Sequence, residues 1–491
     1  MDGVSESRLA WAVLVPLLGA GAVMATGRRP NVREACSLIV AVALLALTAS
    51  LIPAVQAGRT LRCTLFELLP GLSITLRADA LSMIFALTAA FLWVVTVFYS
   101  AGYMRGLAEH AQTRFNVCFA LALFGAIGCA FSDNLLTLYL FYEIVSVTTY
   151  PLVAHHQDDE GYEGGRKYLV YLTTTAKALL LPALIGIYVL VGHLDFADNL
   201  RTGILPADVS RGVVTALYVA CLLGFAKHGV MPLHHWLPGA MVAPTPVSAL
   251  LHAVAVVKVG VFSTVRVMLH VFGIDMMQGC SLGLPTAYFV SFTILTASVI
   301  ALSQDNLKLR LAYSTVSQLS YIILGVALLT PEGIAGGLLH LANHAFAKIT
   351  LFFCAGAIYV ATHKKNISEM QGLGRAMPLT FGAFALASLS MIGAPPVGGF
   401  VSKWYLLLGA LDAGSMAVLG VLVASTLLNA AYFVPVVYQA FFGKPAGGPV
   451  AGGWREASAA MVIPLALTAL ISVALGLYPN LFLNFAKSLL P

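Results

Sequence analysis

Apolar stretches of about twenty residues follow one another along almost the whole chain, and they constrain the fold more than any other feature. Hydrophobic residues make up 59% of the 491 residues, and only 10% are charged. Soluble domains carry about 25% charged residues. The apolar runs also lack the alternation that is typical of strands in a membrane barrel. The sequence therefore predicts an all-α polytopic membrane protein.

The apolar pattern predicts about 14 transmembrane helices, since each crossing needs about 20 residues. Their approximate ranges are 9–26, 33–56, 79–99, 114–131, 134–154, 167–192, 211–231, 246–270, 283–303, 309–329, 333–361, 376–410, 414–442 and 458–485. Four regions are expected, which are helices 1–3 (residues 1–113), a first five-helix repeat (114–270), a second five-helix repeat (283–442) and helix 14 (443–491). The first apolar stretch is expected to stay in place as a membrane helix rather than to be cleaved as a signal.

An internal repeat relates the two central regions. Lys177 corresponds to Lys348 at an offset of 171 residues, and Lys227 corresponds to Lys403 at an offset of 176 residues. Because each unit holds five helices, an odd number, the second copy is expected to be inverted in the membrane, as in many transporters. The alternative is that the two regions share only a packing pattern.

Prolines predict breaks in helices 7 and 12. Lys227 is followed by Pro232, and Lys403 is preceded by Pro395 and Pro396. Proline removes a backbone donor and clashes with the preceding turn. Irregular backbone at membrane depth is tolerated where it lines a wet cavity. Each break is therefore expected to place freed backbone carbonyls beside a lysine.

Several ionisable residues fall within the predicted helices. These are the lysines Lys177, Lys227, Lys258, Lys348 and Lys403 and the acid Glu143. A charge at the bilayer centre costs roughly 2.5–3.5 kcal/mol on insertion scales, so such groups indicate a proton or ion pathway. A carboxylate in this setting is neutral or paired with a cation. Lys227 is the expected partner of Glu143, with a static structural ion pair as the alternative.

Histidines accompany these lysines. His252 precedes Lys258 by six residues, so the two do not strictly share a helix face, although they could flank one water chain. His340, His344 and Lys348 are spaced i, i+4, i+8 on one face. Desolvated lysines and histidines can exchange protons near neutral pH. A proton relay is expected, and a zinc site or ordinary packed histidines are the alternatives.

Three other features have simpler interpretations. His155 and His156 stand beside an acidic loop that is expected to be solvated surface, with a proton antenna as the alternative. Arg266 is expected to extend to water from a helix end. The seven cysteines are scattered and have no metal spacing. With no nucleotide-binding or haem motif either, we expect no cofactor and no resident metal.

Positive charge is distributed unevenly over the predicted loops. Fourteen lysines and arginines fall in the odd-numbered loops, and seven fall on the other side. The positive-inside rule then places both termini outside, in a bacterial inner membrane with a periplasmic face.

Several motifs recur in one known family. They are Tyr142-Glu143, Lys227 with Pro232–Pro238, Ala243–His252 leading to Lys258, Leu311–Gln318, Asn343–Lys348 and Pro395–Lys403. Over nearly its whole length the chain resembles the antiporter-like subunits of respiratory complex I, membrane-bound hydrogenases and Mrp-type multisubunit sodium/proton antiporters. The resemblance implies a core of fourteen helices and a switchable Glu143–Lys227 pair. It also implies a hydrated chain through His252, Lys258, Lys348 and Lys403.

The resemblance further implies an ion-translocating subunit within a larger complex. The segments Ile367–Met370 and Gly372–Pro378 look similar to the D-type Mrp subunit, so a subunit of that type is expected. A proton-pumping subunit of complex I (NADH:quinone oxidoreductase) or of a membrane-bound hydrogenase is the second candidate. A subunit for inorganic carbon uptake, or a scaffold, is the third. Expected partners are other membrane subunits, the lipid bilayer and H⁺, with Na⁺ or K⁺ as further candidates; nucleic acid is not expected.

Overall fold

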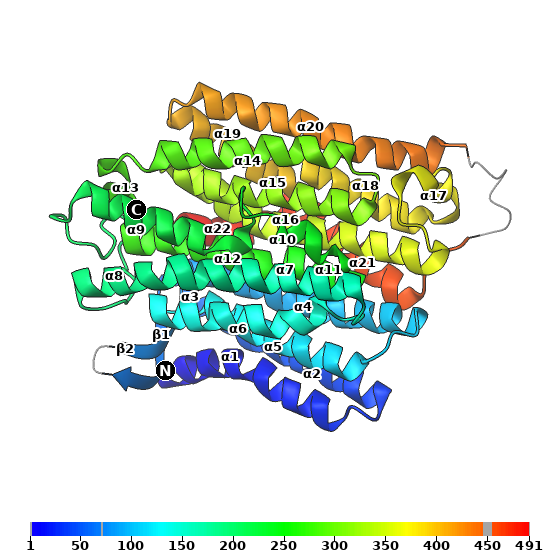
Figure 1. The fold of residues 1–491 in the computed structure, drawn as a ribbon, viewed down its shortest axis with the longest axis horizontal. Coiled ribbons are helices and arrows are strands. Elements are labelled where there is room, and N and C mark those ends of the chain that lie inside the picture. The colour runs from blue at the N-terminus through cyan, green and yellow to red at the C-terminus, as the bar shows by residue number, and fades with distance from the viewer. Residues whose placement is uncertain (1, 70–71, 445–453, 491) are drawn as a thin grey trace.

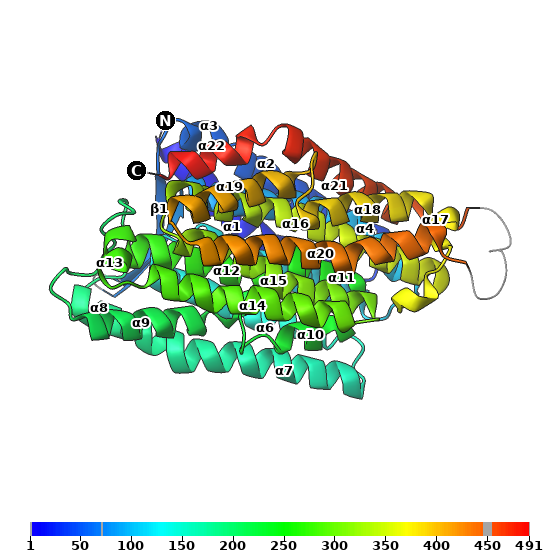
Figure 2. The same cartoon turned by 90° about the horizontal axis from the view of Figure 1, so that it is seen from above.

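The computed structural model describes residues 2–69, 72–444 and 454–490, and the side chains of residues 2–5, 69 and 251–252 lie outside this description. Figures 1 and 2 show long helices that lie side by side along one common direction. The chain enters at α1 (Asp2–Ala25) and ends at α22 (Asn480–Ser488), and both of these ends lie at the same end of the bundle (Figures 1 and 2). This placement agrees with an expectation of both termini on one side.

The other helices are α2 (Pro30–Ala49), α3 (Ile52–Gln56), α4 (Ala80–Gly106), α5 (Gln112–Ala130), α6 (Leu135–Val153), α7 (Asp159–Thr175), η1 (Ala176–Leu180), α8 (Leu181–Val191), α9 (Arg211–Gly224), η2 (Ala226–His228), α10 (Trp236–Gly239), η3 (Ala240–Val242), α11 (Thr245–Ala253), α12 (Val256–Val267), η4 (Met268–Phe272), α13 (Ile274–Gly279), α14 (Gly283–Ser303), α15 (Leu307–Ala327), α16 (Pro331–Thr362), η5 (Ile367–Glu369), α17 (Leu373–Ala376), α18 (Pro378–Ile392), α19 (Gly398–Asp412), α20 (Met416–Phe442) and α21 (Ala459–Leu477).

The all-α prediction is confirmed for the membrane part of the fold. Among the described residues, 10 helices are long and apolar enough to span a membrane. The remaining four predicted spans coincide with α9, the pair α11 and α12, α15, and the pair α18 and α19. The number fourteen, the inverted repeat and the four residue ranges stay predictions.

Interruptions occur at both expected places. Helix α9 ends at Gly224, before the short turn η2 that holds Lys227. Helices α18 and α19 are separated by residues 393–397, which include Pro395 and Pro396. A further interruption, which the prolines did not predict, separates α11 from α12, where Ala255 N–H donates to the carbonyl of Leu250 at 2.9 Å. Three helices therefore break near a lysine.

A β-hairpin forms the one β-sheet of the described residues, and it was not predicted from the sequence. Strands β1 (Leu61–Leu69) and β2 (Leu72–Ala78) pair antiparallel. In β2 the polar residues Ser73, Thr75 and Arg77 alternate with apolar ones, a period-two pattern that indicates a strand, although Ile74–Ala78 are buried on both faces. The hairpin lies at the end of the bundle where α1 begins (Figure 1).

Candidate functional site

Lys227 is completely buried, and its amine is held by helix α6. Lys227 Nζ donates to the carbonyl oxygen of Tyr142 at 2.9 Å and to Ser146 Oγ at 2.7 Å. The same nitrogen lies 3.1 Å from the centroid of the Tyr142 ring. The hydroxyl of Tyr142 in turn accepts from the backbone N–H of Lys227 at 3.2 Å. Tyr142 and Ser146, which flank Glu143 along α6, therefore hold the amine of this lysine.

Glu143 does not form the direct ion pair with Lys227 that the sequence suggested. Within the described part of the chain, its Oε1 is buried and has no hydrogen-bond partner, and no cation lies within salt-bridge distance. Lys227 and Lys177 still act electrostatically on the carboxylate. Ser146 contacts the Lys227 amine and also interacts with Glu143, so a hydroxyl stands between the two charges.

Lys177 differs from the other four lysines because its side chain is exposed on the surface of the single chain. It lies in η1, a π-helical turn between α7 and α8. Lys177 therefore lies within a helix, as predicted, but on the outer surface of this chain, and its part in the pathway stays a prediction. The π turn carries one extra residue in the helix, which rotates the following side chains.

Lys258 forms the contact at the centre of the series. This lysine is 1% exposed at the start of α12, directly after the break that separates α11 from α12. Its Nζ lies 2.9 Å from Nδ1 of His344 on α16. His252 belongs to α11, on the other side of the break, and its side chain lies outside the described residues.

His340 lies one turn before His344 on α16, and the predicted shared face is confirmed. The two rings are 5.9 Å apart and nearly parallel. His340 Nδ1 lies 2.9 Å from Ser402 Oγ, and His340 Nε2 lies 2.9 Å from Gln318 Oε1. Both nitrogens of His340 are thus engaged by protein groups, and a zinc ion would have to displace these bonds.

The two remaining lysines bind backbone carbonyls. Lys348 Nζ donates to Leu311 O at 3.2 Å and to Ser314 Oγ at 2.5 Å. Lys403 Nζ donates to Met391 O at 2.9 Å and to Ile392 O at 3.0 Å. Both acceptors of Lys403 are carbonyls that the end of α18 leaves without a helical partner. The expectation that a break places freed carbonyls beside a lysine is confirmed here.

At the first break the freed carbonyls have other partners. The ring of His228 lies 2.7 Å from Leu222 O, and the indole of Trp236 donates to Ala226 O at 3.0 Å. Lys227 contacts α6 instead. Gly260 of α12 packs directly on this segment, since a Cβ there would lie 2.2 Å from His228 N and 2.4 Å from Lys227 C. The backbone of Lys227 therefore touches the helix that carries Lys258.

A network of charged residues that was not predicted from the sequence lies at the C-terminal end of α12. Arg266 is completely buried rather than extended to water, so that expectation is wrong. Its guanidinium donates to Asp79 at 2.5 and 2.9 Å and to Ser82 Oγ at 2.9 Å. Arg77 also binds Asp79, at 2.8 Å. Burial opposes ionisation of Asp79, but Arg266 and Arg77 outweigh it and hold the pKa of this carboxyl well below its usual range.

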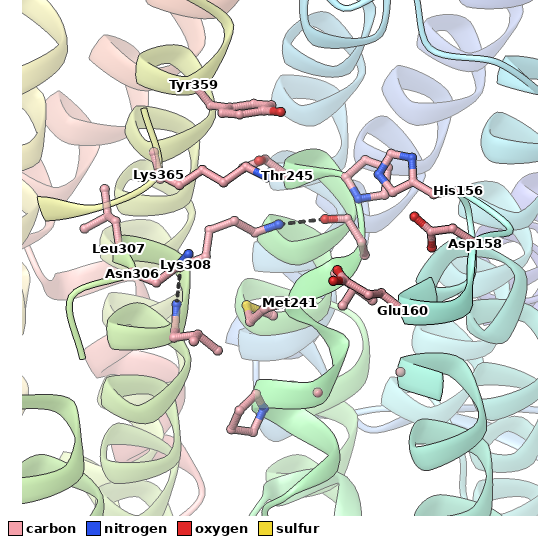
Figure 3. A pocket seen from close by; sticks show the side chains of 18 of the residues that line it. His156, Asp158, Glu160, Met241, Thr245, Asn306, Leu307, Lys308, Tyr359 and Lys365 are labelled. Carbon is pink, nitrogen blue, oxygen red and sulfur yellow. Dashed lines mark hydrogen bonds between the residues drawn. The ribbon is translucent and has the colours of Figure 1, made fainter. Parts of the chain in front are cut away.

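A cavity of about 620 Å³ opens among the loops at the other end of the bundle. Figure 3 shows its lining, with acidic residues such as Asp158 and Glu160 on one wall and Lys308 and Lys365 on the other. The Lys308 amine donates to Ala243 O at 2.6 Å. Thr245, in the first turn of α11, also lines the cavity. The cavity thus reaches the start of the helix that ends at the break before Lys258.

Known proteins resemble this chain in sequence and in structure. The family described as "NADH:quinone oxidoreductase/Mrp antiporter, TM" matches residues 132–429. NADH-quinone oxidoreductase subunit N of Desulforudis audaxviator is 35% identical over 431 residues, which cover 83% of each chain. The Na(+)/H(+) antiporter subunit A1 of Staphylococcus haemolyticus is 30% identical over 463 residues, which cover 88% of this chain and 56% of that protein.

The fold matches that of single chains in two solved membrane complexes. A chain in the structure of the Mrp complex from a Dietzia species superposes with a TM-score of 0.87 at 24% identity, and the match covers 99% of this chain and 96% of that chain. A chain of the membrane-bound sulfane sulfur reductase, an archaeal respiratory complex, also superposes with a TM-score of 0.87. This chain belongs to the family of multi-pass membrane subunits that NADH:quinone oxidoreductases and Mrp antiporters share.

Proposed function

We propose that this chain carries protons through the membrane along Glu143, Lys227, Lys258, His344, His340, Lys348 and Lys403. The contact between Lys258 Nζ and His344 Nδ1, at 2.9 Å, carries the proposal. An ammonium can donate to the ring, or a protonated ring can donate to a neutral amine, so the contact persists with the proton on either side. His252, in the helix that precedes Lys258, and Lys177 belong to the same proposed pathway.

Water is expected to join these groups. Buried polar groups in native proteins bond to protein or to ordered water. Among the described residues, Glu143 Oε1 is buried without a hydrogen-bond partner. Thr149 Oγ1, Tyr168 Oη and Tyr321 Oη are buried without a well-formed hydrogen bond, although Thr149 and Tyr168 interact with each other and Tyr321 interacts with Ser425 and Asn429. These groups mark positions where water can bridge one titratable group to the next.

The exposure of Lys177 is an argument that a neighbouring subunit covers this side of the chain. Lys177 lies within the span Asp159–Val191, at a depth where a cation facing lipid costs roughly 2.5–3.5 kcal/mol. We propose that another membrane subunit covers Lys177 and Glu143, in a multisubunit complex of a bacterial inner membrane with both termini outside.

Two assemblies compete for this role. An Mrp-type sodium/proton antiporter, with this chain as its D-like subunit, needs no electron donor and moves Na⁺ or K⁺ against H⁺. A redox-driven complex would use the same residues with a different energy source, and the 35% identity to an NADH-quinone oxidoreductase subunit favours it. A subunit of a carbon-uptake complex, or a scaffold, is disfavoured because a scaffold has no need of buried lysines.

The test uses the whole complex, purified from its native membrane and reconstituted in vesicles. Its subunit masses and its iron–sulfur and flavin content separate the two assemblies. Glu143→Gln and Lys227→Met are then expected to abolish proton movement while the complex still assembles. Proton movement at the wild-type rate in both variants would contradict the proposal.

A further inference from the structure

Four side chains gather where two loops meet at the end of the bundle that holds the cavity. Glu109 and His110 belong to the loop that joins α4 to α5, and His155 and His156 follow the end of α6. The loops hold these residues firmly, because the guanidinium of Arg114 donates to His155 O at 2.8 Å. The neighbouring acidic residues Asp158–Glu160 are exposed, as expected of solvated surface, whereas His155 itself is completely buried.

The distances suit a small cation. Ligand atoms of Glu109, His110 and His155 all lie within 4.8 Å of one another. Glu109 Oε2 is 3.8 Å from His155 Nε2 and 3.7 Å from His156 Nδ1. Donors bound at roughly 2.0–2.2 Å in a tetrahedral zinc site lie about 3.4 Å apart. Small rotations of the exposed His110 and the partly exposed Glu109 would therefore close the set around one ion.

His155 supplies an independent sign of a ligand. Its ring is buried, and within the described part of the chain neither Nδ1 nor Nε2 has a hydrogen-bond partner. The nearest groups are the His110 backbone, which interacts with the ring, Glu109 Oε2 at 3.8 Å from Nε2, and the rings of His110 and His156 with centroids at 4.9 and 5.6 Å, and none of them forms a well-formed hydrogen bond with either nitrogen. A buried imidazole with both nitrogens unused is costly unless another group binds it.

The charges around the ring decide which ligand fits. His155 is enclosed beside His110, His156 and Arg114, and an imidazole nitrogen offers a lone pair to a metal ion. Glu109 contributes one negative charge, and Arg114 contributes one positive charge behind the His155 carbonyl. Two imidazoles and one carboxylate suit zinc and related transition metals, whereas magnesium and calcium prefer oxygen ligands.

We propose that Glu109, His110 and His155 form a binding site for a divalent transition-metal cation of the zinc type. Three protein ligands leave a fourth position, which His156 or water fills. The site is reached from the aqueous side, because His110 is exposed and Glu109 is partly exposed.

Occupancy of this site would affect the cavity beside it. Glu109 and His156 both line the cavity of about 620 Å³, and a bound cation would neutralise one of its acids and fix both side chains. We therefore expect zinc to inhibit ion movement. This consequence rests on the proposed function, whereas metal binding itself does not.

The experiment titrates the whole purified complex, stripped with a chelator, with zinc against a fluorescent zinc indicator, and measures bound metal by mass spectrometry. His110→Gln is the main variant because this side chain is exposed, and Glu109→Gln and His155→Gln are its companions. His363→Gln, an exposed histidine outside the cluster, is the matched control. Zinc affinity should fall in the three variants by at least the roughly 10–100-fold that loss of an outer-shell partner costs.

Equal zinc affinity in wild type and in His110→Gln would contradict the proposed metal site. Cobalt, as a spectroscopic substitute, should give the visible absorption of a tetrahedral site in wild type and in His363→Gln only. Zinc should also slow proton movement in wild type but not in His110→Gln. Binding that is lost in the variant without any change in inhibition would overturn the inhibitory consequence. The zinc titration tests the proposed metal site even if the complex moves no protons.

Discussion

The amine of Lys258 lies 2.9 Å from Nδ1 of His344, and neither side chain is more than 1% exposed. One partner stands at the start of an interrupted helix and the other in the middle of α16, a continuous helix of 32 residues. The interruption brings the lysine to the histidine, and the long helix holds the histidine beside His340.

Replacing His344 separates hydrogen bonding from proton exchange. In His344→Asn the amide oxygen can still accept from the Lys258 amine, but it does not titrate. We expect this variant to assemble normally and to move no protons above the level of empty vesicles. His344→Leu leaves the buried amine without an acceptor, which costs about 1–3 kcal/mol of stability. Thermal unfolding in detergent and proton flux in vesicles check the two effects. Wild-type flux in His344→Asn would remove this histidine from the pathway.

Gly260 permits the contact between α12 and the segment of Lys227. Gly260→Ala would place a methyl group 2.2 Å from His228 N, against backbone that cannot rotate away. We expect a loss of about 3 kcal/mol or more, at the upper end of overpacking effects. Gly420→Ala in α20 is the control, because its Cβ would meet nothing within 4 Å. Equal unfolding temperatures for the two variants would show that the two segments are not packed as described.

Asp79 and Arg266 form a buried pair whose members depend on each other. Asp79→Asn leaves the Arg266 charge uncompensated, so we expect a loss of about 3–5 kcal/mol. The double variant Asp79→Asn with Arg266→Met removes both charges and should recover much of that loss. Unfolding temperatures of Asp79→Asn, Arg266→Met and the double variant complete a double-mutant cycle. Strictly additive losses would mean that the two side chains do not interact.

Asp133 should make stability depend on pH. Burial raises the pKa of Asp133 to about 6, against the opposing effect of Arg62, Arg77 and Arg266, with Asp195 adding to the rise. The folded protein then binds this proton more tightly than the unfolded chain, so this contribution to stability falls as pH rises from about 4 to about 6. Asp133→Asn should remove that slope. The difference in unfolding temperature between wild type and Asp133→Asn should therefore change across this range. A constant difference would contradict the assignment.

Much of the fold could be predicted because it follows from local patterns. Apolar runs located the helices, and Pro395 and Pro396 located the break beside Lys403. The spacing of His340 and His344 placed both rings on one face, and the structure agrees. These features depend on residues close in sequence, and short-range geometry decides them.

Partners far apart in sequence could not be predicted. Arg266 stands near a helix end and looked like a residue that extends to water, but its partner Asp79 lies 187 positions away. Lys227 was assigned to Glu143 by charge alone, whereas the packing of η2 on α6 gives its amine to Tyr142 and Ser146. His155 stands beside a solvated acidic loop in the sequence, but Arg114 and Phe115 of α5 and His110 of the loop after α4 pack against it. In each case the tertiary packing of segments far apart in sequence determines which residues contact the side chain.

The central claim is that protons pass through the Lys258 amine. The most direct measurement is proton flux in vesicles that hold the assembled complex with Lys258→Met, which keeps most of the side-chain volume and removes the amine. The account predicts normal assembly and flux at the level of empty vesicles. Flux equal to that of wild type would contradict it.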